Sequence, residues 1–340
     1  MARVLVTGGS GVIARWCIVE LLRGGHDVRT TVRDPAREAE VRSSIATQVD
    51  PQDRLTFYVT DLKSDDGWVQ AVAGTQYVLH VASPFPPGPP KHEDDLIVPA
   101  RDGTLRVLRA SAAAGVERVV VTSSAAAIAY GPTPPGGTYT ENDWSDPTSP
   151  QTPPYARSKT IAERAAWDFI KTNGGTMTLA VVNPTVVIGP VLGDDPSYSF
   201  QSVSRLLKGD MPMIPRLGFN FVDVRDVADL HLRAMTAPAA AGQRFLGTTT
   251  FAWLADLARI LRERLGPAAR KVPTRVAPDI LVRFLTLFDS SLRGIVEDLG
   301  ERTSYSNEKA RAELGWQPRP FDETVVDCAR SLLANSVVKV

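Results

Sequence analysis

The sequence predicts an α/β protein built on a parallel sheet with helices on both faces. Short β-branched runs alternate with longer segments of helical spacing through the first half of the chain. A glycine-rich turn separates the first run from the first helical segment. Beyond residue 190 the alternation loosens into helices joined by Pro- and Gly-bearing loops. This combination is typical of a Rossmann-like doubly wound sheet with a smaller, mostly helical C-terminal lobe.

The alternation can be followed element by element. Strands are predicted at residues 4–7, 28–32, 56–59, 77–81 and 119–122, and again at 179–182. Helices are predicted at residues 12–23, 37–48, 66–73 and 96–114. A further helix of roughly twenty residues is expected after Pro153. Strands separated by helical segments of this length form βαβ units, so the sheet should be parallel.

The second half predicts helices at residues 202–208, 251–265, 278–287 and 322–333. An apolar strand running into a helix at 219–234 is expected to return to the large sheet. The Pro-rich loops 83–92 and 132–154 are too long to be simple connections, so we expect them to wall a functional site. The predicted division is a first domain of residues 1–190, with 219–237 returning to it, and a lobe of 191–340 that mainly binds substrate.

Composition narrows the class of protein. The 340 residues are 43% hydrophobic and 22% charged, with 38 basic and 38 acidic side chains. A net charge of zero argues against a nucleic-acid partner. The two cysteines, Cys17 and Cys328, exclude a disulfide framework and favour a reducing compartment. Asn183 and two prolines interrupt the most apolar stretch, 179–192, so we expect no membrane span. We expect a cytoplasmic protein that is a monomer or a homodimer.

Residues 7–14 read T-G-G-S-G-V-I-A between the first strand and the first helix. Glycines in this context allow a tight turn and a close approach of the backbone to a pyrophosphate at a helix N-terminus. The alternative is an ordinary glycine turn, but the strand–turn–helix context favours dinucleotide binding. The residues predicted to contact the cofactor here are Gly8, Gly9, Ser10, Gly11, Val12 and Ile13.

The end of the second strand bears on the choice of cofactor. Arg33 follows this strand and Arg37 lies one helical turn further on, so two guanidinium groups can hold one phosphate. This pattern favours NADPH, whose 2′-phosphate an arginine accommodates. The alternative is that both arginines are solvated and that Asp34 binds the ribose of NADH. Asp61 and Leu62, after the third strand, are candidates to cover the adenine.

A catalytic group is predicted where the long helix begins. Tyr155 and Lys159 have i,i+4 spacing, which places both on one helix face. A phenol is a poor acid–base group at neutral pH unless a neighbouring cation favours its anion, and Lys159 supplies that charge. Ser124, at the end of the fifth strand, can hydrogen-bond a carbonyl oxygen. Each feature alone has an ordinary structural explanation, but the three together with the glycine loop point to catalysis.

With these residues in place, the sequence resembles an extended short-chain dehydrogenase/reductase of the dihydroflavonol reductase and yeast methylglyoxal (aldehyde) reductase branch. The resemblance runs from residue 2 to about residue 333. Its markers are T-G-G-S-G-V-I-A (7–14), V-R (32–33), H-V-A-S-P-F (80–85), T-S-S-A (122–125), Y-A-R-S-K (155–159), N-P-T-V-V-I-G-P (183–190) and F-V-D-V-R-D-V-A (221–228).

The resemblance implies roles for individual residues. In the family the tyrosine is the proton donor, the lysine binds the nicotinamide ribose and lowers the tyrosine pKa, and the serine orients the carbonyl; these roles fall on Tyr155, Lys159 and Ser124. It also implies nicotinamide contacts for Pro184 and Val187, and a 2′-phosphate contact for Arg37.

Several positions depart from the family pattern. Ala14 replaces a third glycine, and Asp102 stands where relatives usually have Asn. Residues 151–154 lack the Trp-Cys-Tyr signature of cinnamoyl-CoA reductases, and Ala125-Ala126 replaces the acidic pair of sugar-nucleotide dehydratases. Both absences argue against nucleotide- or CoA-linked substrates.

The predicted function is therefore reduction of an aldehyde or ketone with an apolar or aromatic group, using NADPH and no metal. The predicted substrate contacts are Phe85, Ile128, Tyr130, Tyr198 and Phe200. The alternative is that the aromatic residues among them are core of the small lobe, and for Phe200 the two interpretations are equally balanced. Basic residues near position 210, namely Arg205, Lys208 and Arg216, are the feature that would favour a phosphorylated substrate instead. The alternative functions are a sugar-nucleotide epimerase, a hydroxysteroid-type dehydrogenase and, against the intact Tyr–Lys pair, a non-catalytic dinucleotide sensor.

Overall fold

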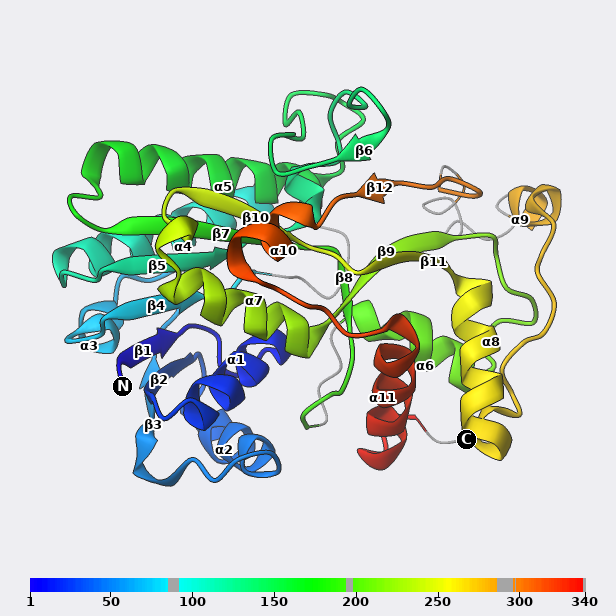
Figure 1. The fold of residues 1–340 in the computed structure, drawn as a ribbon, viewed down its shortest axis with the longest axis horizontal. Helices are drawn as coiled ribbons and strands as arrows, with labels where there is room; N and C mark the ends of the chain where they lie inside the picture. The colour runs from blue at the N-terminus through cyan, green and yellow to red at the C-terminus, as the bar shows by residue number, and fades with distance from the viewer. Residues whose placement is uncertain (85–91, 194–197, 286–295, 297, 339–340) are drawn as a thin grey trace. The chain divides into compact units, whose positions relative to one another are not determined.

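The computed structural model describes residues 1–84, 92–193, 198–285, 296 and 298–338, and its ribbon is shown in Figure 1. The chain forms two compact units. The first consists of residues 1–185, 225–247 and 306–317, and the second of residues 186–224, 248–305 and 318–340. The first unit is therefore built from three segments of the chain, because two segments from the second half of the sequence return to it.

A parallel sheet of seven strands forms the centre of the first unit. Its order is β3-β2-β1-β4-β5-β7-β10, and every neighbouring pair is parallel. Its strands are β1 (Arg3–Val6), β2 (Asp27–Val32), β3 (Leu55–Val59), β4 (Tyr77–His80), β5 (Arg118–Thr122), β7 (Thr178–Pro184) and β10 (Gln243–Gly247). This arrangement confirms the predicted Rossmann-like sheet, whose order reverses between β1 and β4.

Helices cover both faces of this sheet. Most residues of β5 and β7 are buried in succession, as expected of strands covered on both sides. One face carries a core in which Val119, Val121 and Leu179 of the strands pack with Val107 and Leu108 of α4. The helices of the unit are α1 (Val12–Arg23), α2 (Glu38–Ala46), α3 (Trp68–Val72), α4 (Asp94–Ala113), α5 (Pro154–Asn173), α7 (Val224–Thr236, from Arg225 on) and α10 (Glu308–Leu314).

The second unit contains a small sheet of order β11-β9-β8. Strands β8 (Val186–Ile188) and β9 (Gly218–Asp223) are parallel, and β11 (Thr250–Trp253) runs antiparallel to β9. Helices α6 (Gln201–Lys208), α8 (Leu254–Leu265) and α11 (Phe321–Ala334) pack against one another. Among the described residues of this unit, a further helix is α9 (Asp279–Leu285). The short strands β6 (Thr138–Tyr139) and β12 (Ser304–Tyr305) belong to the first and second unit respectively.

Three segments differ from the sequence prediction. The strand expected at 219–223 pairs with β8 and β11 in the small sheet, whereas the helix that follows it joins the first unit. The last strand of the large sheet is instead Gln243–Gly247, which the hydrophobic pattern did not mark as a strand. The helix expected over 251–265 begins only at Leu254, because residues 250–253 extend to pair with β9.

Candidate active site

The glycine-rich loop connects β1 to α1 and packs closely on its neighbours. Gly8 has a φ of 74°, and a Cβ atom there would lie 3.0 Å from Ala82. A Cβ atom on Gly9 would lie 2.3 Å from Oγ1 of Thr30 on β2. Gly8 is therefore required for its positive φ and Gly9 for the space that a side chain would take.

This loop leads directly into the N-terminus of α1, whose N-cap is Gly11. Gly8 and Gly9 donate their N–H groups to Oγ1 and O of Thr31, at 2.9 and 2.8 Å, which fixes the loop on β2. Ser10, Gly11, Val12 and Ile13 all keep access to solvent. The first N–H groups of a helix have no acceptors within the helix and attract anions, so this end of α1 fits a pyrophosphate.

The predicted cofactor-selecting residues lie at the end of β2. Arg33 and Asp34 are exposed, and the Asp34 carboxylate accepts the N–H of Ala36 at 2.9 Å, which caps a short turn. Arg37 donates from Nε to Oε2 of Glu40 at 2.8 Å, and Oε1 of Glu40 accepts from buried Arg15 at 2.5 Å. Burial opposes ionisation of Glu40, but hydrogen bonds and charges from Arg37 and Arg15 outweigh it and lower the pKa.

Asp61 and Leu62 follow β3. The carboxylate of Asp61 accepts the N–H of Lys63 at 2.9 Å, and both Asp61 and Leu62 are half-buried. Leu62 lies against Gly103 of α4, where a Cβ atom would be 2.8 Å from the Leu62 Cβ. The glycine after Asp102 is thus needed for α4 to approach this turn.

The three predicted catalytic residues meet at the carboxyl end of β5. Ser124 caps a short turn after β5 and accepts the Ala126 N–H on its hydroxyl at 3.1 Å. Tyr155 and Lys159 lie in the first turns of α5, which begins at Pro154. The hydroxyl groups of Ser124 and Tyr155 are hydrogen-bonded, and Lys159 Nζ lies 5.9 Å from the centre of the Tyr155 ring.

Burial acts on both titratable members of this group. It raises the pKa of Tyr155, an effect that the hydrogen bond with Ser124 opposes. It lowers the pKa of Lys159 to about 8, an effect that the nearby Glu163 carboxylate opposes. At neutral pH Tyr155 therefore carries its proton and Lys159 its positive charge, which suits a phenol that donates a proton.

Comparison with known proteins agrees with this geometry. The model of the NAD dependent epimerase/dehydratase family matches residues 4–246. The chain belongs to this family. The family resemblance seen in the sequence motifs is thereby confirmed. Two further predictions are confirmed at the level of the family: the chain is an oxidoreductase, and its cofactor is a nicotinamide dinucleotide.

Individual relatives of the family span most of the chain. A cinnamoyl-CoA reductase from Medicago truncatula is 35% identical over 281 residues, covering 81% of this chain and 84% of its own. A ketoreductase from Aspergillus niger is 30% identical and covers 97% of both chains. The structure of yeast methylglyoxal/isovaleraldehyde reductase complexed with NADPH has a TM-score of 0.82 at 26% identity, covering 98% of this chain and 99% of that one.

The structure shows polar residues at this site that the sequence analysis did not assign to it. A pocket beside Lys159 is also lined by His80, Ser123 and Glu163, and by Thr104 of α4. Burial, and then the charge of Lys159, lower the pKa of His80 to about 3, so this ring is neutral; its Nδ1 lies 2.9 Å from Thr7 Oγ1. Glu163 could have been found from the sequence, because it continues the Tyr155–Lys159 face at i+4.

The predicted substrate contacts are divided between the units. Ile128 and Tyr130 lie in the first unit, where Ile128 is fully buried and Tyr130 is 46% exposed. Tyr198 and Phe200 lie in the second unit, where Phe200 is fully buried. Phe85 falls outside the described residues. Ile128 and Phe200 expose no surface, so a substrate contact by either requires a rearrangement.

The two predicted nicotinamide contacts are also divided. Pro184 ends β7 in the first unit, and Val187 lies on β8 in the second. Within the described ranges, no three His, Cys, Asp or Glu residues are grouped so that they could hold a metal ion. No helix in the described part of the chain is long and apolar enough to cross a membrane.

Proposed function

We propose that this chain is an NADPH-dependent carbonyl reductase that converts aldehydes or ketones to alcohols, with Tyr155 as proton donor. The observation that carries the proposal is the hydrogen bond between Tyr155 and Ser124 beside a buried, charged Lys159. The three groups lie at the carboxyl edge of the parallel sheet, where ligands of this fold bind.

The first unit carries features that fit the cofactor. The closely packed glycine loop and the open end of α1 fit a pyrophosphate, and exposed Arg33 with Arg37 fits a 2′-phosphate. The solved structure of the yeast reductase, which is complexed with NADPH, supports the same choice. We assign cofactor binding to the first predicted domain, residues 1–190, and substrate selection mainly to residues 191–340.

Ser124, Tyr155 and Lys159 each have a separate part in the transfer of the proton to the substrate. NADPH, when bound, supplies a hydride to the carbonyl carbon of the substrate. Ser124 donates a hydrogen bond to the carbonyl oxygen, and Tyr155 transfers its hydroxyl proton to that oxygen as negative charge develops there. The positive charge of Lys159 then stabilises the phenolate that remains on Tyr155.

The substrate class that we favour is an aldehyde or ketone with a sizeable apolar or aromatic group. The exposed ring of Tyr130 lies in the segment that follows Ser124, and aromatic side chains bind such groups by excluding water. A second candidate is an acyl-CoA thioester, which the 35% identity to a cinnamoyl-CoA reductase favours. Residues 151–154 read Gln-Thr-Pro-Pro and do not resemble the signature of that enzyme class.

A panel of carbonyl compounds tests the proposal and separates the two candidates. Consumption of NADPH is followed by its absorbance with bulky aryl aldehydes and ketones, small aliphatic aldehydes, acyl-CoA thioesters and sugar nucleotides. We expect the highest kcat/KM with the aryl aldehydes or ketones. Activity confined to acyl-CoA thioesters supports the second candidate, and activity with none of the carbonyl compounds contradicts a reductase.

A further inference from the structure

A buried carboxylate lies one helical turn beyond Lys159. The side chain of Glu163 has no solvent exposure, and both of its oxygens are fully engaged. Oε2 accepts from Ser123 Oγ at 2.5 Å and from Asn183 Nδ2 at 2.8 Å. Oε1 accepts from Arg244 Nε at 2.6 Å and from Trp167 Nε1 at 3.4 Å.

These donors come from different elements. Ser123 follows β5, Asn183 lies near the end of β7, and Arg244 lies on β10, so one carboxylate joins three neighbouring strands to α5. Asn183 Nδ2 also donates to the backbone oxygen of Ser124 at 3.2 Å. The backbone that presents the Ser124 hydroxyl to Tyr155 is therefore held by Glu163 from both sides.

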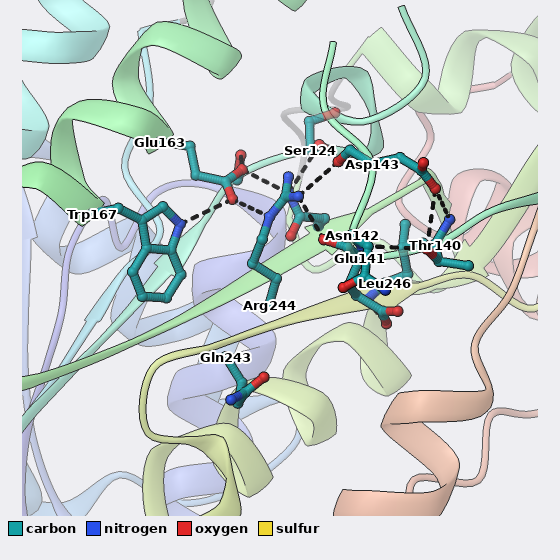
Figure 2. A network of polar contacts seen from close by, with 12 residues as sticks. Ser124, Thr140, Glu141, Asn142, Asp143, Glu163, Trp167, Gln243, Arg244 and Leu246 are labelled. Carbon is teal, nitrogen blue, oxygen red and sulfur yellow. Dashed lines mark hydrogen bonds and ion pairs between the residues drawn. The ribbon is translucent and has the colours of Figure 1, made fainter. Parts of the chain in front are cut away.

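Arg244 extends this network to the loop before α5 (Figure 2). Its Nη1 donates to the backbone oxygens of Glu141 and Asp143 at 2.7 and 2.8 Å, and its guanidinium lies 3.7 Å from the centre of the Trp144 ring. The carboxylate of Glu141 in turn accepts the N–H of Leu246 at 2.8 Å. With 8% of its side chain exposed, Arg244 is the buried cation that pairs with the buried Glu163 carboxylate.

We propose that Glu163, held by Arg244, is the positioning residue of this active site: it fixes Ser124 against Tyr155 and places a carboxylate in the pocket that holds Lys159. The proposal rests on the proposed reductase function and deepens it. Glu163 does not touch the reacting atoms; it acts through Ser123 and Asn183 on Ser124, and through its charge on Lys159. Its position at i+4 from Lys159 places both side chains in the same pocket.

Charged and titratable groups surround Lys159, and Glu163 is the carboxylate among those that line its pocket. Among the described residues, these groups are Tyr155 and Glu163 on α5 and the neutral ring of His80 on β4, and Arg244 on β10 pairs with Glu163. Burial disfavours the charged form of Lys159, and the Glu163 carboxylate is the charge that opposes it.

The first test removes one contact of Glu163 without changing any charge. Ser123→Ala deletes the hydrogen bond to Oε2, and we expect kcat to fall about tenfold or more while the Kd for NADPH stays within about twofold. The matched control is Ser111→Ala, which deletes an equally buried hydroxyl that donates to Val107 O at 2.8 Å on α4. The control should keep wild-type kcat, and wild-type kcat in Ser123→Ala overturns the positioning of Ser124.

The second test measures the charge of Lys159 without turnover. Lysines are labelled with ¹³C at Cε, and the cofactor-free protein is titrated by NMR, with Lys159→Met identifying the signal. In Glu163→Gln the titration midpoint should fall below that of the wild-type protein. A midpoint that does not move overturns the role assigned to Glu163.

A buried Arg244 without its partner is costly, so Glu163→Gln alone can fail to fold. The double variant Glu163→Gln/Arg244→Met removes both charges and keeps similar volumes, and a smaller fall in the Lys159 midpoint is expected in it, because the positive charge of Arg244 is lost as well. A general loss of structure would lower activity equally at all pH values, whereas the proposal requires the alkaline decline of kcat/KM to move to lower pH.

Tyr155→Phe, measured in parallel, separates this inference from the proposed function. Where the wild-type protein reduces carbonyl compounds and Tyr155→Phe does not, full activity of Ser123→Ala contradicts the inference alone. Where the wild-type protein reduces none of them, the proposed function fails, and the NMR titration still decides whether Glu163 maintains the charge of Lys159.

Discussion

Tyr155 and Ser124 come from different elements, yet their hydroxyl groups share one hydrogen bond. A residue that donates a proton in the rate-determining step contributes typically about 10²–10⁴-fold to turnover. Tyr155→Phe keeps the ring and removes only the donor, so we expect kcat to fall by about that factor while NADPH still binds. Steady-state kinetics and a binding titration measure the two quantities, and a variant that keeps most of its kcat would contradict the mechanism.

The lowered pKa of Lys159 makes a prediction about pH. Lys159 is positively charged below its pKa of about 8 and neutral above it, so stabilisation of the Tyr155 phenolate is lost as pH rises through this value. We expect kcat/KM for NADPH, which reports the free enzyme, to decline above about pH 8. Lys159→Arg keeps a cation at high pH and serves as the control: a profile with the same alkaline decline in this variant would assign the decline to another group.

Arg33 and Arg37 differ in how they are held before the cofactor binds. Arg33 is exposed, whereas the guanidinium of Arg37 is already engaged by Glu40. A hydrogen bond to a charged phosphate contributes roughly 1.5–3 kcal/mol, so Arg33→Ala should weaken NADPH about tenfold or more, and Arg37→Ala less. Fluorescence titration measures both affinities, with NADH as the control ligand, for which little change is expected. Equal affinity of the wild-type protein for NADH and NADPH would show that the arginines do not select the cofactor.

Some residues of the candidate site could be predicted from the sequence because their chemistry is local. Tyr155 and Lys159 occupy one helix face, and the glycines follow one strand. Arg244 could not be predicted in this way, since its partner Glu163 lies 81 positions away and nothing near Arg244 forms a pattern. A buried ion pair between distant elements becomes visible only when the strands are placed in order.

At the scale of elements, periodicity predicted the strands β1 to β5 and β7, which are rich in β-branched, other apolar or aromatic residues. It did not predict β10, which begins with Gln243 and Arg244 and so lacks a continuous apolar run. It also extended α8 over residues 251–253, because Phe251 and Trp253 fit a helical face as well as a strand. Pairing with a neighbouring strand decided both cases, and a single segment carries no information about that pairing.

The packing of the glycine loop on β2 makes a prediction at this scale. Gly9→Ala places a methyl group 2.3 Å from Thr30 Oγ1, and overpacking of this kind costs typically about 1–3 kcal/mol. Thr30→Ala removes the hydroxyl and methyl groups that would collide, and loses one hydrogen bond to Val6 O. We therefore expect the double variant to be more stable than the sum of the single changes implies, as measured by urea unfolding. Additive effects would contradict the proposed collision.

At the scale of the whole molecule, the chain crosses between the two units five times. The first unit is completed only by residues 225–247 and 306–317, each of which follows a segment of the second unit in the sequence. Strand β9 and helix α7 are continuous in sequence, yet they divide between the units at residues 224 and 225. A boundary of this kind follows from contacts between distant segments, so hydrophobic periodicity could not locate it.

The late return of β10 affects the order in which the protein can fold during synthesis. When residue 190 leaves the ribosome, β7 is an open edge, and Glu163 has no guanidinium beside it until residue 244 has also been made. At about 5–20 residues per second this interval lasts several seconds. An unpaired strand edge is prone to pair with other chains, so we expect this edge of the nascent protein to be open to such pairing until residues 243–247 have been made.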